Sequence, residues 1–237
     1  MPERLSTGIE GLDKIIQGGF PRGTVNLVSG PAGSGKTLLG LHFFHGGATV
    51  QGENSMYLSL EEPRANLDKV LGTFGMEMAP FESMGKLVLL DLGELRVADK
   101  NAGPMLGFGE LQDFLRSSLR KNSVERLVID SLSAIGLHYR SMRDLREELF
   151  LFVRFLHETN VTALMITESL ENAGLTRWGF EQFVADSFIH LGMEETKGEL
   201  RRTITIRKMR FTKHDTVKHP LRITQTGIVV EADERVV

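Results

Sequence analysis

Short runs of apolar residues alternate with longer amphipathic stretches along most of this 237-residue chain. Five of the runs are apolar at nearly every position, which is typical of strands buried on both faces of a parallel sheet. We predict strands at residues 24–29, 55–60, 86–91, 126–130 and 161–167. The alternation of such strands with helices is the pattern of an α/β fold.

Apolar residues three and four positions apart predict the helices between these strands. One helix opens just after residue 37, and its apolar positions are Leu38, Leu39, Leu41, Phe43 and Phe44. Further helices are predicted at residues 63–74, 110–121 and 141–159, the first with a proline well placed in its first turn. The combined pattern predicts a mostly parallel, twisted sheet flanked by helices.

Two segments depart from this rhythm. Residues 93–109 are polar and contain four glycines and a proline, so we predict a long, mobile loop there. From Val184 onward, strands separated by turns take over, including runs at residues 202–207 and 228–230. These runs predict a C-terminal antiparallel β extension at the edge of the sheet.

Residues 30–37 read Gly-Pro-Ala-Gly-Ser-Gly-Lys-Thr, the G-x-x-x-x-G-K-T phosphate-binding loop, or P-loop. In this motif backbone N–H groups close around a phosphate, Lys36 reaches the β- and γ-phosphates, and the Thr37 hydroxyl binds Mg²⁺. The loop joins a predicted strand to a predicted helix, whose N-terminus attracts phosphate. We therefore predict that the chain binds a nucleoside triphosphate. The expected contact residues are Gly30, Ala32, Gly33, Ser34, Gly35, Lys36, Thr37 and Leu38.

Acidic residues follow two of the predicted strands, at the end of a parallel sheet where ligands bind. Asp130 ends the run Leu-Val-Ile-Asp and is predicted to hold Mg²⁺ through water, although it could instead cap the following turn. Glu61 and Glu62 come directly after the strand at 55–60. Either could activate water for hydrolysis, and either could instead complement the dipole of the next helix.

Composition narrows the classes of function. Hydrophobic residues make up 41% and charged residues 25% of the chain, as in globular cores, and the net charge is −3. An acidic chain is not expected to coat nucleic acid generally. The chain has no cysteine, no leader-like N-terminus and no membrane-spanning run, so we predict a cytoplasmic protein without a membrane partner. One P-loop and no internal repeat predict a single domain over residues 1–237.

One stretch reverses this acidic balance. Residues 196–222 hold nine Lys or Arg and only two acids. Within the stretch, Lys208 and Arg210 alternate along a predicted strand, so both cations point to the same face. Such a cluster is either a solvated sheet edge or a site for an anion.

The order of these motifs resembles the RecA superfamily, and specifically the KaiC-like ATPases. The resemblance runs from Arg4 to about Glu231, and it is carried by the P-loop and by residues 6–13, 18–23, 57–62, 127–131, 180–186 and 208–215. It implies a RecA-like P-loop core and slow, Mg²⁺-dependent hydrolysis of ATP. In that reaction Lys36 would be catalytic together with the water-activating Glu61 or Glu62.

The resemblance also implies active sites that are shared between subunits. In KaiC-like proteins, ATP held by the neighbouring subunit is contacted by the residues that match Lys208, Met209, Arg210, Thr212, His214 and Thr224. Lys208 and Arg210 would then act in trans like arginine fingers, neutralising charge as the γ-phosphate leaves. Sharing of this kind implies a homo-oligomeric ring, expected to be a hexamer, because a head-to-tail interface closes or extends into a filament.

The chain departs from the family pattern at several positions. Phe211 stands where a glycine is usual, and Gln225 where an acidic residue often lies, which would alter recognition of the nucleotide base. Glu181 and Gln182 occupy the phosphoacceptor site of the clock protein, so autophosphorylation cannot occur there. The chain also carries one KaiC domain rather than the two of the clock protein.

Three classes of function are compatible with these features. The first is a KaiC-like ring that changes shape with nucleotide and acts as a switch or scaffold for an unidentified protein partner. The second is a recombinase-like ATPase on single-stranded DNA, in which residues 169–180 form a pore loop with Arg177 and Trp178 tracking the strand. The stretch is not basic, so packing of Trp178 within the protein is favoured. The third is a module that binds nucleotide without hydrolysing it. It is disfavoured because such a module has no need of Glu61 or Glu62.

Overall fold

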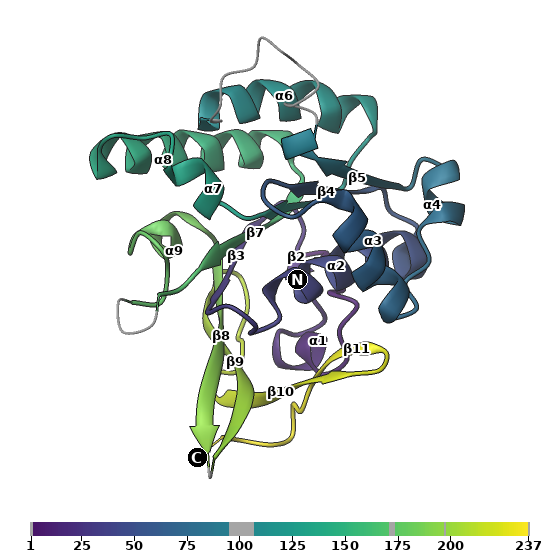
Figure 1. Cartoon of the computed structure of the whole chain (residues 1–237), viewed down its shortest axis with the longest axis vertical. Coiled ribbons are helices and arrows are strands. Elements are labelled where there is room, and N and C mark those ends of the chain that lie inside the picture. Colours follow the sequence, from purple (N-terminus) through teal and green to yellow (C-terminus); the bar gives the residue numbers. More distant parts are fainter. Residues whose placement is uncertain (1, 95–106, 171–173, 197, 237) are drawn as a thin grey trace.

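A nine-stranded sheet organises the chain, in the order β11-β10-β9-β8-β3-β7-β6-β4-β5 (Figure 1). The computed structural model describes residues 2–94, 107–170, 174–196 and 198–236. The six neighbouring strands from β8 to β5 pair in parallel. The predicted α/β fold with a mostly parallel sheet is therefore confirmed.

Each of the five predicted central strands is present within one residue of its expected bounds. The strands of the sheet are β3 (Val25–Gly30), β4 (Ser55–Ser59), β5 (Leu87–Asp91), β6 (Arg126–Asp130), β7 (Thr162–Glu168), β8 (Ser187–Thr196), β9 (Glu199–Met209), β10 (Lys218–Thr224) and β11 (Gly227–Val230). The P-loop strand β3 is buried along its whole length, in agreement with its apolar sequence. A second, two-stranded sheet pairs β1 (Arg4–Leu5) with β2 (Phe20–Pro21), which are too short for the sequence pattern to predict.

Helices cover both faces of the sheet (Figure 1). One face carries α2 (Lys36–Gly46), its π-helical continuation η1 (Gly47–Gln51), α3 (Arg64–Thr73) and α4 (Ala79–Ser83). The other face carries α6 (Phe108–Lys121) and α8 (Met142–Thr159), and three short helices are α1 (Leu12–Ile15), α7 (Ser133–Gly136) and α9 (Glu181–Val184). None of the helices in the described ranges is long and apolar enough to span a membrane.

The predicted loop at 93–109 is shorter at its C-terminal end than expected. Helix α6 begins at Phe108, and the Glu110 side chain accepts the Gly107 N–H there, which satisfies one backbone donor at the start of the helix. Residues 95–106 of the predicted loop lie outside the described part of the chain. At the start of α8, Ser141 accepts the Asp144 N–H, which explains why this helix begins where the sequence pattern placed it.

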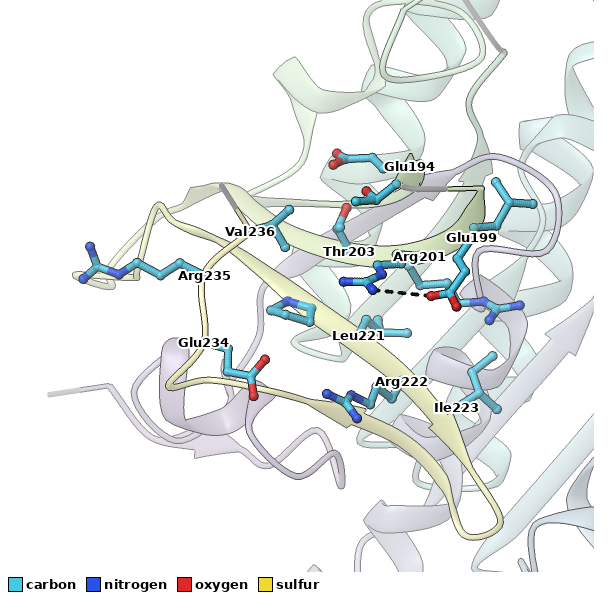
Figure 2. A pocket seen from close by; sticks show the side chains of 14 residues that line it. Glu194, Glu199, Arg201, Thr203, Leu221, Arg222, Ile223, Glu234, Arg235 and Val236 are labelled. Atoms are coloured by element: carbon cyan, nitrogen blue, oxygen red, sulfur yellow. Dashed lines mark hydrogen bonds and ion pairs between the residues drawn. The ribbon is translucent and has the colours of Figure 1, made fainter.

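The last three strands form the predicted antiparallel extension. Strands β8 and β9 pair over most of their length, and β10 and β11 continue the sheet beyond them. A groove of about 690 Å³ opens between β9, β10 and residues 234–236 (Figure 2). Its lining includes four arginines and three glutamates, and Arg201 pairs with Glu199 across a distance of 3.4 Å. The basic stretch seen in the sequence is therefore folded mainly into β9 and β10.

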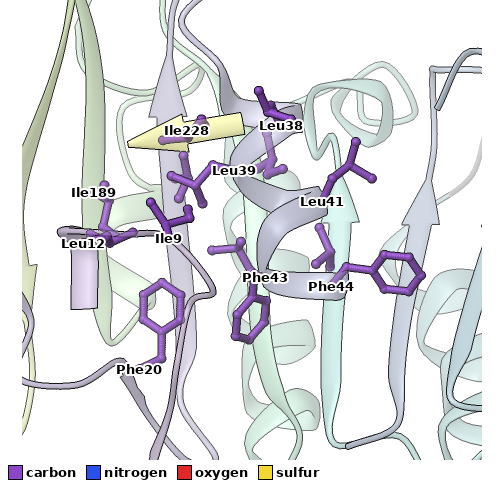
Figure 3. Close-up of a cluster of buried hydrophobic side chains, with 14 of the residues drawn as sticks. Ile9, Leu12, Phe20, Leu38, Leu39, Leu41, Phe43, Phe44, Ile189 and Ile228 are labelled. Carbon is purple, nitrogen blue, oxygen red and sulfur yellow. The ribbon is translucent and has the colours of Figure 1, made fainter. Parts of the chain in front are cut away.

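Two hydrophobic clusters hold the helices to the sheet. The first packs α2 and α3 against one face and includes Phe20, Leu39 and Phe43, all fully buried (Figure 3). The second packs α6 and α8 against the other face. Ile228 of β11 and Ile189 of β8 belong to the first cluster, so the C-terminal extension shares its core with the P-loop helix.

A fully buried arginine joins the start of β6 to the end of α2. The Arg126 guanidinium pairs with Glu53 at 2.5 Å, donates to the backbone oxygens of Ser6 and Phe43, and bonds the side chain of Gln51. It also lies over the Phe43 ring, 4.8 Å from the centroid. Burial lowers the pKa of Arg126, and the hydrogen bond and charge of Glu53 oppose that change.

We predict that Arg126→Met lowers the free energy of unfolding by about 3 kcal/mol or more, because Glu53 and the carbonyl oxygens lose a buried partner. Urea denaturation measures this change. Lys14→Met is the control, since the Lys14–Asp233 pair is largely exposed and such pairs contribute about 0–1 kcal/mol. Equal unfolding free energies for the two variants would show that the Arg126 network contributes no special stability.

Candidate functional site

The P-loop turns sharply between β3 and α2. Gly33 and Gly35 adopt left-handed φ angles of 77° and 102°, which L side chains rarely adopt. The Pro31 carbonyl oxygen accepts from the Ser34 N–H, the Ser34 hydroxyl and the Lys36 ammonium group, the last at 2.9 Å. Helix α2 then begins at Lys36, so the N–H groups of its first turn face the concave side of the loop.

The side chains of Lys36, Thr37 and Asp130 meet at the ends of β3 and β6. Asp130 is buried, and the Thr37 and Tyr57 hydroxyl groups both interact with its carboxylate, Tyr57 at 2.5 Å. Burial raises the pKa of Asp130, while the bonds from Tyr57 and Thr37 and the charge of Lys36 oppose that rise. Burial likewise lowers the pKa of Lys36, against the opposing charges of nearby carboxylates.

The residues around Asp130 fit a magnesium site. A hydroxyl and a carboxylate oxygen are hard ligands of the type that Mg²⁺ prefers, and Mg²⁺ takes few protein ligands when it also binds phosphate. Within the described ranges, no group of three or more His, Asp or Glu is spaced to hold a metal alone. Helix α7 has no side-chain cap, so Asp130 does not act as the helix cap that the sequence left open.

The adjacent acids Glu61 and Glu62 lie in different surroundings. Glu61 accepts a hydrogen bond of 2.5 Å from the Ser131 hydroxyl, the residue directly after Asp130. Its charge also acts on the pKa of Lys36. Glu62 instead accepts from the Asn66 amide on α3, and the Ser59 hydroxyl bonds its backbone. Glu61 is therefore bonded to the residue beside Asp130, while Glu62 bonds α3 and reaches the site only through its charge, which helps to raise the pKa of Asp130.

Glu168, a carboxylate that the sequence analysis missed, also belongs to this site. It ends β7 beside the P-loop strand, with Gly30 opposite it in the ladder. Among the carboxylates that oppose the lowered pKa of Lys36, Glu168 has the largest effect. The Arg177 guanidinium pairs with it at 3.7 Å. The one sequence signal for Glu168 is its position at the end of an apolar strand. The sequence does not show that this strand lies next to β3 in the sheet.

The C-terminal extension covers the outer side of the P-loop. Arg202 on β9 donates its Nε–H to the Gly33 carbonyl oxygen at 2.9 Å. The Ile223 and Ile228 side chains lie within van der Waals distance of a side chain placed at Gly35. His42 on α2 accepts the Ile228 N–H at 3.0 Å, and burial lowers the pKa of His42 to about 4. No motif in the sequence pointed to these contacts.

Lys208 and Arg210 lie at the opposite end of the sheet from the P-loop. The Lys208 ammonium group donates to the backbone oxygens of Gln182 and Ala185, and Arg210 pairs with Asp186 at 3.1 Å. Burial alone would raise the pKa of Asp186, but bonds from His157, the Val25 N–H and Arg210 lower it overall. This carboxylate holds Arg210 beside Val25, the first residue of β3.

The other residues expected to act in trans are spread over three places. Thr212 and His214 follow Arg210, and a hydrogen bond links the His214 ring to the Thr212 carbonyl oxygen. The Met209 side chain is buried in the same core cluster as the P-loop helix. Thr224 ends β10, next to Ile223, and therefore lies near the chain's own P-loop rather than near Lys208.

The segment that a DNA-binding role would use is engaged within the chain. The Trp178 ring stacks on Phe180 with centroids 6.0 Å apart and closely approaches Gly136 of α7. The Glu181 side chain is fully buried and accepts from the Thr167 hydroxyl and from the N–H groups of Trp178 and Phe180. These contacts favour the packing interpretation of Trp178, and they give Glu181 a structural role.

Comparison with protein families matches the family described as "ATPase: KaiC" over residues 5–235. A protein of Thermotoga maritima named UPF0273 protein is 33% identical over 99% of this chain and 98% of its own length. The circadian clock oscillator protein KaiC of Parasynechococcus marenigrum is 32% identical over 96% of this chain. The chain spans only 44% of that clock protein.

Among solved structures, the chain is similar to a KaiC-like protein of Pyrococcus horikoshii. The TM-score is 0.85 at 34% sequence identity, over 97% of this chain and 99% of the other. The expected resemblance is thus confirmed at the level of family and fold.

We predict that Tyr57→Phe weakens nucleotide-dependent Mg²⁺ binding by roughly 10-fold or more, as loss of a supporting hydrogen bond does at other metal sites. Without the Tyr57 hydroxyl the pKa of Asp130 rises further, so binding is lost at a higher pH as the solution is acidified. A titration of Mg²⁺ with ATP present, repeated across pH, measures both effects. Tyr139→Phe, whose hydroxyl accepts the Phe108 N–H elsewhere, is the control.

Proposed function

The chain belongs to the KaiC ATPase family, and on this premise we propose that it hydrolyses ATP with Mg²⁺ in a homo-oligomeric ring. In this ring each active site lies between two subunits. One subunit supplies the P-loop, Asp130 and Glu61, and its neighbour supplies Lys208 and Arg210. The observation that carries the proposal is the position of this cation pair, at the far end of the sheet from the chain's own P-loop.

The separation within one subunit is too large for the pair to act in cis. Arg210 donates its N–H to the Asp186 carbonyl oxygen, and Asp186 lies level with Val25 at the start of β3. Gly30 is five residues further along β3, or roughly 16 Å at the usual rise per residue. Strand β8 also separates β9 from β3. The two cations therefore serve a phosphate only if another subunit brings it to them.

The P-loop half of the site supplies binding and water activation. Backbone N–H groups of the loop and the Lys36 ammonium group bind the β- and γ-phosphates. Thr37 and Asp130 would hold Mg²⁺, which neutralises charge on the phosphate oxygens when it is bound. Glu61 orients the attacking water and accepts its proton, since its side chain is tied by Ser131 to the residue after Asp130.

A shared site of this kind has consequences for assembly. Because the donating and receiving surfaces differ, the interface is head-to-tail and closes into a ring, for which six subunits are expected from the family. The nucleotide then lies in the interface and can change its geometry when it is hydrolysed. We propose that a protein partner responds to this change, so that the ring works as a switch or scaffold. The internal contacts of Arg177 and Trp178 do not favour DNA as the partner.

We predict that Glu61→Gln lowers kcat by about 10²–10⁴-fold, as removal of a general base does, while ATP still binds. Glu62→Gln retains most of the activity because Glu62 bonds Asn66 rather than the metal site. Steady-state phosphate release together with equilibrium ATP binding measures both quantities. A larger loss for Glu62→Gln than for Glu61→Gln would contradict the assignment.

Mixing two inactive variants tests the shared site directly. Arg210→Ala keeps the P-loop half and loses a finger, with an expected fall in kcat of about 10³-fold or more. The double variant Glu61→Gln, Glu62→Gln keeps its fingers and its ATP binding but cannot activate water. We predict that a one-to-one mixture regains roughly a quarter of the parental activity, the share of interfaces that pair two intact halves in a random ring.

The size of each variant and of the mixture is checked by light scattering with ATP present. A mixture of intact rings that stays inactive would contradict the shared site. Full activity of Arg210→Ala alone would contradict the role of Arg210.

A further inference from the structure

Phe211, which follows Arg210 directly, has an unusual backbone conformation. Its φ angle is +60°, in the left-handed region where a bulky residue is a genuine outlier. Its side chain is also 68% exposed, so the ring gains little by packing within the chain. Such strain persists where the surrounding structure holds it, and it clusters at sites with a function.

The turn that carries Phe211 is held from the N-terminal segment. The Arg4 guanidinium donates to the Phe211 carbonyl oxygen at 3.2 Å and to the Thr212 hydroxyl at 3.0 Å. The same guanidinium donates to the backbone oxygens of Ile16 and Gly19. The Asp215 N–H adds a bond to the Ile15 carbonyl oxygen. The strained turn is therefore fixed to β1, α1 and the chain leading to β2.

The position of the Phe211 side chain connects this residue with the shared active site. Phe211 adjoins Arg210, at the end of β9 that faces away from the chain's own P-loop. The residues on either side of it along the chain, Arg210 and Thr212, are polar, which suits a nucleotide better than an apolar protein surface. The cation and the ring together offer groups for a phosphate and for a base.

The aromatic rings on the P-loop helix and on the neighbouring strand β4 are buried. Tyr57, Phe43 and Phe44 pack around α2 and are fully buried. In the described ranges, the large exposed aromatic side chains are Phe150, Phe183 and Phe211. A base bound at the P-loop therefore finds no stacking partner among the buried rings of its own subunit.

We propose that Phe211 stacks on the base of the nucleotide that the neighbouring subunit holds. This inference rests on the proposed function, because the ring reaches a nucleotide only across a shared interface. Aromatic side chains stack on any base through its π-face, and the contribution of such stacking to binding is substantial. Phe211 would thus set nucleotide affinity, while Arg210 beside it acts on the phosphates.

The mixture of inactive variants provides a test specific to position. In the active interfaces, the Arg210→Ala subunit supplies the P-loop. The subunit with Glu61→Gln and Glu62→Gln, called the double-glutamine subunit below, supplies Phe211. We expect Phe211→Gly in the double-glutamine subunit to raise KM for ATP by about 10-fold, with kcat nearly unchanged. The same change in the Arg210→Ala subunit leaves KM unchanged, because the Phe211 side chain of that subunit faces an active site that does not hydrolyse ATP. Phe211→Tyr in the double-glutamine subunit restores the parental KM.

Stability supplies a second readout that is independent of hydrolysis. Glycine adopts a φ of +60° without strain, so Phe211→Gly is expected to raise Tm by about 2–4 °C. An unchanged KM, or an equal rise in KM from either subunit, overturns the stacking role. The stacking role is also overturned if Phe211→Gly weakens assembly while KM in the intact oligomers stays unchanged. The Phe211 side chain would then be a contact between subunits. An inactive parent mixture overturns the shared site itself, and this inference with it.

Discussion

The buried charge of Arg126 is the constraint on which the placement of the site depends. Its guanidinium satisfies backbone oxygens of the N-terminal segment and of α2 and pairs with Glu53 just before β4. The partners of Arg126 thus lie at or near the ends of α2 and β4, and Arg126 itself begins β6. The opposite end of each of these elements carries or leads to an active-site residue. Helix α2 begins with Lys36, β4 leads to Glu61, and β6 itself ends at Asp130. A charge that cannot be left unpaired in the core therefore fixes the lines along which the active-site residues approach one another.

The fold could be predicted from the sequence because its signals are local. Apolar runs of five to seven residues marked the central strands, and the P-loop marked the turn between β3 and α2. What could not be predicted depends on which strands are neighbours. Glu168 joins the site because β7 pairs with β3, and Arg202 reaches Gly33 because β9 folds back past the loop. Thr224 separates from Lys208 for the same reason, since β10 returns antiparallel to β9. Sequence spacing carries no information on these contacts between distant residues.

The charges of the chain divide between the two halves of the proposed site. Around Lys36 lie three carboxylates, those of Asp130, Glu61 and Glu168, so this half is acidic before any nucleotide binds. A triphosphate adds further negative charge, which calls for a divalent cation and for positive side chains from elsewhere. The basic stretch of an otherwise acidic chain is folded mainly into β9 and β10. Near the end of β9, Asp186 pairs with Arg210, and backbone oxygens hold Lys208. In the proposed ring, pairing the two halves between subunits would bring opposite charges together.

Strand β9 touches both kinds of half-site, through Arg202 at the P-loop of its own subunit and through Lys208 near its other end. A one-residue irregularity in the β8–β9 ladder lies just before Lys208. In the proposed ring, one strand of each subunit would therefore contact the subunit's own P-loop and also carry the cations offered to a neighbour. A head-to-tail assembly of this kind would be directional, since each subunit offers its cations to one neighbour and receives those of the other.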